Sequence, residues 1–193
     1  MARFEDAVLG ADGRRRCAWS VTSPEYIAYH DDEWGFPLTD ERRLFEKICL
    51  EGFQAGLSWI TILRRREGFR GAFDDFDASK IAEYGEADIA RLLADERIIR
   101  HRGKIEATIG NARALLALDT PLVGLVWSFA PQAGTRKRPA SFVDVPAVTP
   151  ESTALSKELR RRGFRFVGPT TMYALMQSAG LVDDHVEGCW RAG

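Results

Sequence analysis

Apolar residues recur at helical spacing through most of this chain, and this pattern constrains the fold more than any other feature. Leu44, Phe45 and Ile48 share one face of a segment that begins after the capping residue Asp40 and is expected to end near residues 52–56. The same spacing extends furthest over residues 102–118. No alternating strand pattern of any length accompanies it. We therefore predict an all-α fold.

The remaining helices follow from the same spacing and from end signals such as a basic last turn or a following glycine. We expect them over residues 57–66, 77–84, 86–94, 123–129, 151–162 and 172–179. Residues 123–129 are apolar on all sides, so a buried strand is the less favoured alternative there. Residues 131–150 contain four prolines and a basic run, so they are predicted to form an exposed loop, to which we assign no function. Residues 1–15 are predicted to be a loosely ordered extension, and 16–193 a single body.

Length and composition exclude several classes of protein. A chain of 193 residues suggests one compact body. No apolar stretch approaches the roughly 20 residues of a membrane span, so we expect no transmembrane helix and no membrane partner. The N-terminus carries two acids before any apolar stretch, which does not fit a secretory signal. Three widely spaced cysteines indicate a reducing compartment. These features predict a cytoplasmic protein.

The charges nearly cancel, with 27 basic and 28 acidic residues, which argues against a polyanion binder that acts through a basic tail. Basic residues nevertheless cluster in 97–113 and again in 157–165. The clusters are compatible with one electropositive face. Solvated helix faces are the more common explanation of such clusters when they stand alone.

A short turn between the last two predicted helices carries the best local signal for DNA binding. Gly168 lets the backbone approach a phosphate closely, and Thr170 and Thr171 lie at the start of the following helix, where free N–H groups bind anions. A helix-hairpin-helix motif holds the DNA backbone in this way without reading its sequence. These residues alone are equally compatible with an ordinary helical corner.

Two pairs of metal-binding residue types lie near the two ends of the chain. His185 and Cys189 are four residues apart, a spacing that puts both side chains on one side of a helical turn, and Cys17 and His30 lie near the other end. Two Cys and two His form a closed tetrahedral set, which favours structural zinc and would join the ends. A buried thiol or a core histidine is the more common fate of each residue.

Aromatic residues concentrate in the first third of the chain. They are Trp19, Tyr26, Tyr29, Trp34, Phe53 and Trp59. Such rings more often belong to a core than to a binding site. However, Glu51 ends an apolar helix with no basic residue beside it, directly before a turn rich in small residues. Stacked rings and one carboxylate suit a flat, electron-poor ligand such as a methylated base.

Several of these segments also resemble one known family when they are taken together and in order. The matching segments are 17–19, 26–35, 50–60, 98–105, 111–113, 166–168 and 184–189. They resemble the bacterial DNA-3-methyladenine glycosylases of type I over residues 16 to 189. Long motifs in the right order make this resemblance far more specific than any single pattern above.

The resemblance implies a helix-hairpin-helix glycosylase fold whose N- and C-terminal segments are joined by one structural Zn²⁺. It implies a monomer that hydrolyses the N-glycosidic bond of 3-methyladenine in alkylated double-stranded DNA and leaves an abasic site. It assigns the zinc to Cys17, His30, His185 and Cys189. It also assigns base contact to Glu51, base stacking to Trp59, the rest of the pocket to Trp19, Tyr26 and Tyr29, and the filling of the gap in the duplex to Gln54 and Leu57.

The family lacks the catalytic aspartate found in related glycosylases, so Asp183 and Asp184 receive no catalytic role. Methylation at N3 makes the base cationic and already a good leaving group, so a pocket that stacks and desolvates it can suffice. No lysine is placed to form a Schiff base, and we expect a monofunctional enzyme. Phe53 stands where the family often has a polar residue.

Two other functional classes are compatible with parts of this pattern. A non-catalytic helix-hairpin-helix module would bind duplex DNA in a salt-sensitive way and have no affinity for the free base. A zinc hydrolase is disfavoured, because four protein ligands leave no open coordination position.

Overall fold

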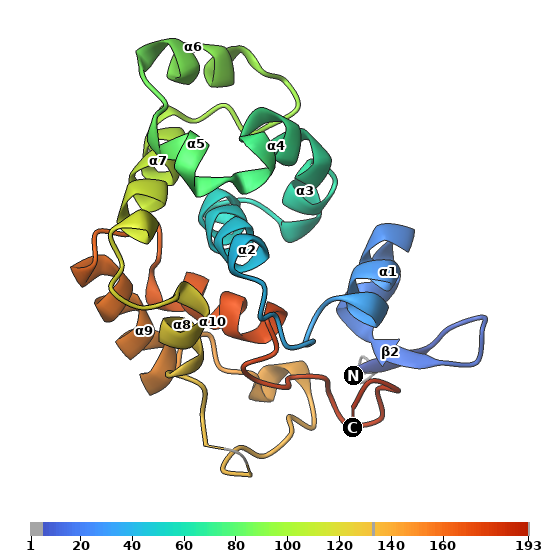
Figure 1. Cartoon of the computed structure of the whole chain (residues 1–193). Coiled ribbons are helices and arrows are strands. Elements are labelled where there is room, and N and C mark those ends of the chain that lie inside the picture. Colours follow the sequence, from blue (N-terminus) through green and yellow to red (C-terminus); the bar gives the residue numbers. More distant parts are fainter. Residues whose placement is uncertain (1–5, 133, 193) are drawn as a thin grey trace.

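The computed structural model describes residues 6–132 and 134–192, and this part of the chain is mostly helical (Figure 1). None of the described helices is long and apolar enough to cross a membrane. In chain order the elements are β1 (Ala7–Leu9), β2 (Arg15–Cys17), η1 (Ala18–Thr22), α1 (Pro24–Asp32), α2 (Glu41–Gln54), α3 (Trp59–Leu63), α4 (Arg66–Ala72), η2 (Asp74–Phe76), α5 (Ala78–Ala82), α6 (Glu86–Ala94), α7 (Arg102–Leu116), α8 (Leu122–Trp127), η3 (Phe142–Asp144), α9 (Pro150–Arg161) and α10 (Pro169–Ser178).

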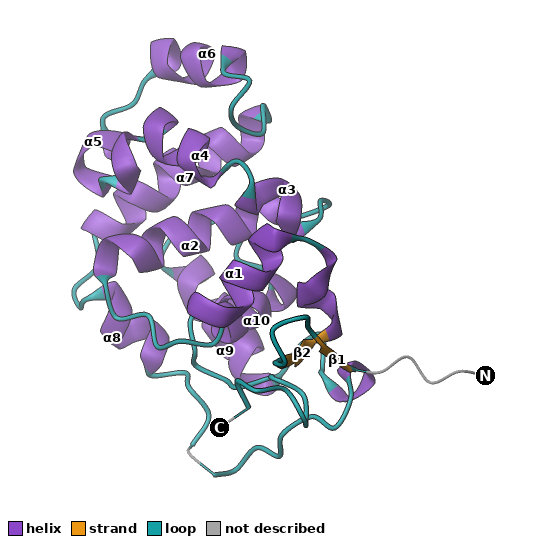
Figure 2. Cartoon of the chain, turned by 90° about the vertical axis from the view of Figure 1, so that its right-hand side faces the viewer, coloured by secondary structure: helices purple, strands orange, loops and turns teal. Residues whose placement is uncertain are grey.

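The N-terminal segment departs from the predicted all-α, loosely ordered start. Strands β1 and β2 form a short antiparallel hairpin in which Ala7 pairs with Cys17 (Figure 2). Arg16 on β2 is buried and binds the carboxylates of Asp12 and Asp31. The prediction of loose order is therefore wrong for residues 6–15, and residues 1–5 lie outside the described residues. Strands of three residues are too short to give an alternating pattern.

Helix α2 occupies the middle of the molecule. Its side-chain cap is Asp40, which accepts a hydrogen bond from the Arg43 N–H, and its apolar face is fully buried. The helix contacts α3, α7, α8 and α10. In Figure 1 it lies between a group formed by α4 to α7 and a group formed by α8 to α10. Side chains on α2 can therefore contact both groups of helices.

Two helices differ from the prediction near the aromatic cluster. Helix α1 was not predicted; it begins at Pro24, and the Ser23 hydroxyl accepts a hydrogen bond from the Tyr26 N–H. The single helix expected over 57–66 is instead α3 and α4. Between them Arg65 adopts φ −101° and ψ 1°, which interrupts the helix.

The connection between α9 and α10 is held tightly against α2 and α7. The side-chain amide of Asn111 on α7 donates to the Arg165 carbonyl and accepts from the Arg165 N–H. Phe166 has a positive φ of 56°. A Cβ on Gly52 of α2 would lie 3.1 Å from the Phe166 Cβ, so the glycine permits this close approach. The turn is thus fixed relative to the molecule's central helix.

Candidate active site

A cavity of about 200 Å³ lies between the N-terminal segment, α2, α3 and α10. Aromatic rings dominate its walls, and Glu51 is the one acid among the described residues that line it. The lining consists of Trp19, Tyr26, Tyr29, Trp34, Glu51, Gln54, Trp59, Phe142, Ala174, Gln177 and Ser178. The cavity thus combines residues from both ends and from the middle of the chain.

The aromatic rings support one another mostly edge to face. Trp19 meets Tyr26 at 5.4 Å between ring centroids and an angle of 87°. Tyr29 and Trp59 are tilted by 43° at 5.6 Å. The Tyr26 hydroxyl accepts a hydrogen bond of 2.9 Å from the backbone N–H of Ile60, which fixes the start of α3 and with it Trp59. The walls are therefore preorganised for a flat apolar or aromatic ligand.

Glu51 is a buried carboxylate that lacks a full set of partners. Its side chain is on the last turns of α2 and is 3% exposed. The Ser178 hydroxyl donates to Oε1 at 3.2 Å, whereas Oε2 is buried without a hydrogen-bond partner. Burial raises the pKa of Glu51 to about 7, against the opposing effects of Lys47 and Ser178. An unsatisfied carboxylate oxygen in a cavity is well suited to accept from a ligand donor or to face a cation.

The loop after α2 projects beside the cavity. Lys104 on α7 donates to the carbonyls of Phe53 and Ala55, at 2.8 and 2.6 Å, and so satisfies the exposed end of α2. The Leu57 N–H donates to the Gln54 carbonyl, and the Leu57 side chain is 40% exposed. Gln54 lines the cavity, whereas Leu57 is outside its lining at the loop tip.

A second cluster brings together Cys17, His30, His185 and Cys189. All four are buried, and their potential ligand atoms lie within 4.8 Å of one another. The Cys189 sulfur is 3.4 Å from His30 Nε2 and 3.7 Å from His185 Nδ1, and the Cys17 sulfur is 3.8 Å from His185 Nδ1. Zinc bonds of about 2.3 Å to sulfur and 2.0 to 2.1 Å to nitrogen imply tetrahedral edges of about 3.6 Å. The four donors therefore fit a tetrahedral metal site.

The residues around this cluster orient its histidines. His30 Nδ1 is 2.8 Å from the Asp31 carboxylate, which leaves Nε2 facing the Cys189 sulfur. Asp31 is itself held by Arg16 on β2. A carboxylate behind a histidine is the usual support of a metal-binding imidazole. The hairpin that sequence analysis missed thus contributes to the arrangement of the cluster.

The first basic cluster is largely neutralised within the molecule. Arg97 pairs with Asp95, and Arg102 pairs with Glu86 and Glu106. The Arg113 guanidinium donates to backbone carbonyls. This stretch therefore fits solvated and internally paired helix faces better than an electropositive surface.

The second basic cluster ends at the turn before α10. Arg161 and Arg162 pair with Glu158. The Arg160 guanidinium reaches 3.6 Å from the position that a Cβ on Gly168 would take. Gly168 is the N-cap of α10, and Thr170 in its first turn is exposed. A cation and a helix N-terminus thus lie together at the predicted DNA-binding turn.

Comparison with known proteins places this geometry in a family. The family model described as methyladenine glycosylase matches residues 19–192. The chain belongs to the methyladenine glycosylase family. DNA-3-methyladenine glycosylase 1 of Escherichia coli (strain K12) is 53% identical over 177 residues, which cover 90% of this chain and 95% of the relative.

Solved structures of the family resemble this methyladenine glycosylase closely. A crystal structure of 3-methyladenine DNA glycosylase I superimposes with a TM-score of 0.88 at 52% identity, over 91% of this chain and 98% of that one. The structure that describes 3-methyladenine recognition by the Staphylococcus aureus enzyme gives 0.84 at 37% identity, over 90% and 94%. The structural similarity covers nearly the whole chain, and the family match over residues 19–192 includes every residue that lines the cavity.

The structure of this methyladenine glycosylase brings most of the residues predicted from sequence together. Six line the cavity: Trp19, Tyr26, Tyr29, Glu51, Gln54 and Trp59. The four metal-ligand candidates meet in the second cluster. Gly168, Thr170 and Thr171 lie at the start of α10, whereas Ser178 near its other end reaches the cavity. The predicted residues therefore form three separate groups.

Sequence analysis missed part of the cavity lining. Phe142 comes from the loop to which no function was assigned, and Ser178 and Gln177 come from the end of α10. The spacing of Ala174 and Ser178 places them on one helix face, but nothing local indicates what that face meets. Phe53 is 1% exposed, and its ring centroid lies 4.6 Å from that of Phe69, so its side chain belongs to the core and not to the cavity.

Proposed function

We propose that this enzyme hydrolyses the N-glycosidic bond of 3-methyladenine in alkylated double-stranded DNA, as a monofunctional step of base-excision repair. The observation that carries the proposal is the aromatic cavity with a buried carboxylate oxygen that has no partner. A flipped base would enter between the rings, and its positive charge would face Glu51. The family membership and the relatives' names support the same reaction.

The chemistry asked of the protein is modest, because the substrate base is already activated. The bond between the sugar C1′ and N9 breaks with its electron pair passing to the base, which leaves as neutral 3-methyladenine. A water oxygen bonds to C1′ and releases a proton. In this proposal Trp59 stacks on the base, Trp19, Tyr26 and Tyr29 complete the pocket, and Glu51 recognises the base and opposes the cationic character of the transition state.

DNA contact is assigned to two places beside the cavity. Gln54 and Leu57 on the loop after α2 would fill the space that the flipped nucleotide leaves, and the exposure of Leu57 supports this role. The turn before α10, with Gly168, Thr170 and Thr171, would hold the phosphate backbone as a helix-hairpin-helix motif. In this proposal the enzyme acts as a monomer. Because its substrate is chromosomal DNA, this proposal places the enzyme in the cytoplasm.

The metal cluster is proposed to hold one structural Zn²⁺ through Cys17, His30, His185 and Cys189. Buried sulfur and imidazole donors at tetrahedral spacing support this choice. When bound, the ion would act as a cross-link between the N- and C-terminal segments, which together form one lobe. The middle of the chain and residues 151–180 form the other, and the cavity lies between them.

The decisive experiment is base release from DNA that carries 3-methyladenine. We expect the wild-type protein to release the free base and leave abasic sites without strand cleavage. Glu51→Gln and Trp59→Ala should each reduce release at least about 10²-fold, because each removes a contact to the base. Chromatography of the released base, at equal protein concentration, compares the wild type with the two variants. If the wild-type protein releases no base, the proposal is wrong.

A purely DNA-binding module would behave differently in the same experiment. It would bind duplex DNA in a salt-sensitive way, release no base and show no affinity for free 3-methyladenine. No feature of the described residues favours this alternative, since a DNA-binding surface alone needs no buried carboxylate in an aromatic cavity.

A further inference from the structure

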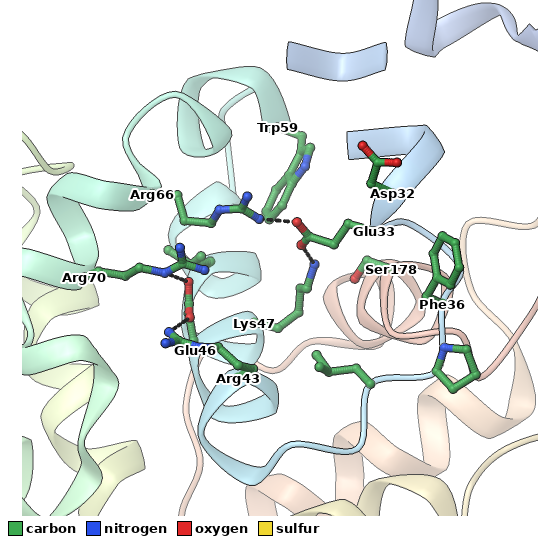
Figure 3. Close-up of a pocket in the computed structure, with 13 residues that line it drawn as sticks. Asp32, Glu33, Phe36, Arg43, Glu46, Lys47, Trp59, Arg66, Arg70 and Ser178 are labelled. Atoms are coloured by element: carbon green, nitrogen blue, oxygen red, sulfur yellow. Dashed lines mark hydrogen bonds and ion pairs between the residues drawn. The ribbon is translucent and has the colours of Figure 1, made fainter. Parts of the chain in front are cut away.

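A second cavity, of about 240 Å³, adjoins the aromatic cavity and shares Trp59 and Ser178 with it. It lies along the N-terminal half of α2. Figure 3 shows Lys47 reaching from α2 toward Glu33, while Arg66 approaches the same carboxylate from the other side. Lys47, Glu33 and Arg66 have no part in the function proposed above, yet they lie next to the aromatic residues of the first cavity.

Lys47 is a buried cation whose position is set by Glu33. Its side chain is 7% exposed, and Nζ donates to Glu33 Oε1 at 2.6 Å. The same ammonium group lies 3.5 Å from the Tyr29 hydroxyl, and 5.0 and 5.8 Å from the ring centroids of Tyr29 and Trp59. Lys47 is thus placed against two walls of the base pocket without entering its lining.

Lys47 and Glu51 are one helical turn apart on α2, a spacing at which side chains of opposite charge commonly pair. Within the described residues they form no ion pair; Lys47 binds Glu33 instead. A direct pair would occupy the carboxylate that the base needs. The observed arrangement leaves Glu51 Oε2 without a partner while a cation remains nearby.

We propose that Lys47 is a positioning residue for base recognition: its ammonium group, held away by Glu33, favours the ionised form of Glu51 without occupying the carboxylate. This inference rests on the proposed function, because ionised Glu51 is the form that a cationic base requires. Without Lys47, a larger fraction of Glu51 would be protonated at neutral pH, and the attraction for the base would weaken.

The other polar and charged groups around Glu51 come from helices α1 and α10 and from Glu33. Tyr29 approaches from α1, and burial together with the nearby Glu51 holds the pKa of its phenol well above the usual range, so it stays neutral. Ser178 approaches from α10 and donates a hydrogen bond. Burial acts to raise the pKa of Glu33, but Lys47 and Arg66 outweigh it and keep Glu33 charged. Lys47 is therefore the charge that favours ionisation of Glu51.

The test compares variants at the two ends of the ion pair. Lys47→Met should move the acid limb of the pH profile for base release upward by about one pH unit. Release at pH 7 should then fall about fivefold and recover to within about twofold of wild type at pH 9. Glu33→Gln should move the limb the opposite way, because Lys47 is then free to approach Glu51. Lys47→Arg should keep the wild-type profile.

The titration of Glu51 is measured directly as well, by the ¹³C NMR signal of its carboxyl carbon, identified by its loss in Glu51→Gln. This signal should shift its midpoint in the same directions. Arg70→Met is the matched control, since it removes one partner of Glu46 at the wall of the same cavity. We expect it to leave both the profile and the titration unmoved. Lys47→Gln carries the same prediction as Lys47→Met if the latter does not fold.

Two results would overturn the inference. One is a loss of rate in Lys47→Met and Glu33→Gln at every pH with no movement of the limb, as a purely structural role requires. The other is a shift of the Glu51 midpoint in the same direction for both variants. If the wild-type protein releases no base at any pH, the proposed function fails instead, and the NMR titration still decides whether Lys47 controls Glu51.

Discussion

Burial has a measurable cost at the single residue Glu51. Its carboxyl has a pKa of about 7 in the folded protein, against an ordinary value of 4.5, chiefly because of burial. Below pH 4.5 the group is protonated in both states. As the pH rises toward 7, the unfolded chain loses the proton while the folded chain retains it, so folding becomes less favourable. At neutral pH the folded protein is therefore less stable because it buries this carboxyl group, which the proposed base recognition needs.

Glu51→Gln should therefore stabilise the protein in a pH-dependent manner. The free energy of unfolding of the variant minus that of wild type should increase between pH 4.5 and 7, by up to about 3 kcal/mol, and stay constant above. Urea unfolding at pH 5 and pH 8 measures the difference. Glu67→Gln, at an exposed position on α4, serves as control and should show no such increase. A pH-independent difference for Glu51→Gln would show that folding does not raise the pKa of this carboxyl.

At the scale of elements, the function depends on how helices hold short loops. The α9–α10 turn is fixed by Asn111 of α7, and the loop after α2 is fixed by Lys104 of the same helix. Helix α7 therefore positions both of the segments that we assign to DNA contact.

Asn111→Ala should weaken DNA binding more than base binding. The change leaves the N–H and carbonyl of Arg165 without partners, which we expect to cost about 1 to 3 kcal/mol of stability. Affinity for duplex DNA should fall several-fold, while affinity for free 3-methyladenine should stay near wild type. Fluorescence anisotropy with duplex DNA and titration with the free base measure the two.

The matched control for Asn111→Ala is Thr108→Val on α7, which removes a buried hydroxyl that donates to the Lys104 carbonyl in the same helix and interacts with the Cys49 thiol of α2, but does not contact the α9–α10 turn. It should leave DNA affinity unchanged. Equal losses of DNA and base affinity in Asn111→Ala would contradict the assignment of the turn to DNA.

For the whole molecule, the two ends of the chain are brought together at the cysteine–histidine cluster. Cys17 and His185 are 168 residues apart in sequence, yet their side chains meet. The N-terminal segment carries Trp19, Tyr26 and Tyr29 to the cavity, so the geometry of the cluster and that of the cavity depend on each other. Loss of the cluster should therefore affect both stability and base binding.

We expect the purified protein to contain about one equivalent of zinc, and its removal by a chelator at neutral pH to lower the melting temperature. Cys17→Ser and Cys189→Ser should each lose the metal and several kcal/mol of stability. Cys49→Ala, a buried thiol of α2 outside the cluster, is the control and should retain the zinc. Metal analysis by mass spectrometry and thermal unfolding provide the readouts. Full stability of metal-free wild-type protein would contradict a structural ion.

Local pattern was sufficient to predict several elements and the residue types of the site. Helix α6 was predicted with its bounds, and α2 and α7 nearly so, because apolar spacing and capping depend on residues within a turn or two of one another. The unusual position of Glu51 at the end of an apolar helix was also visible. The resemblance to the family also predicted which of these residues form the same site.

Only the tertiary structure decided what those residues meet. It placed Phe142 and Ser178 in the cavity, Phe53 in the core, and Lys47 on Glu33 instead of on Glu51. It also ordered the β1–β2 hairpin through Arg16. The physical reason is range: helix formation is governed by neighbours along the chain, whereas burial, pKa and ion pairing are set by segments that pack together from distant parts of it.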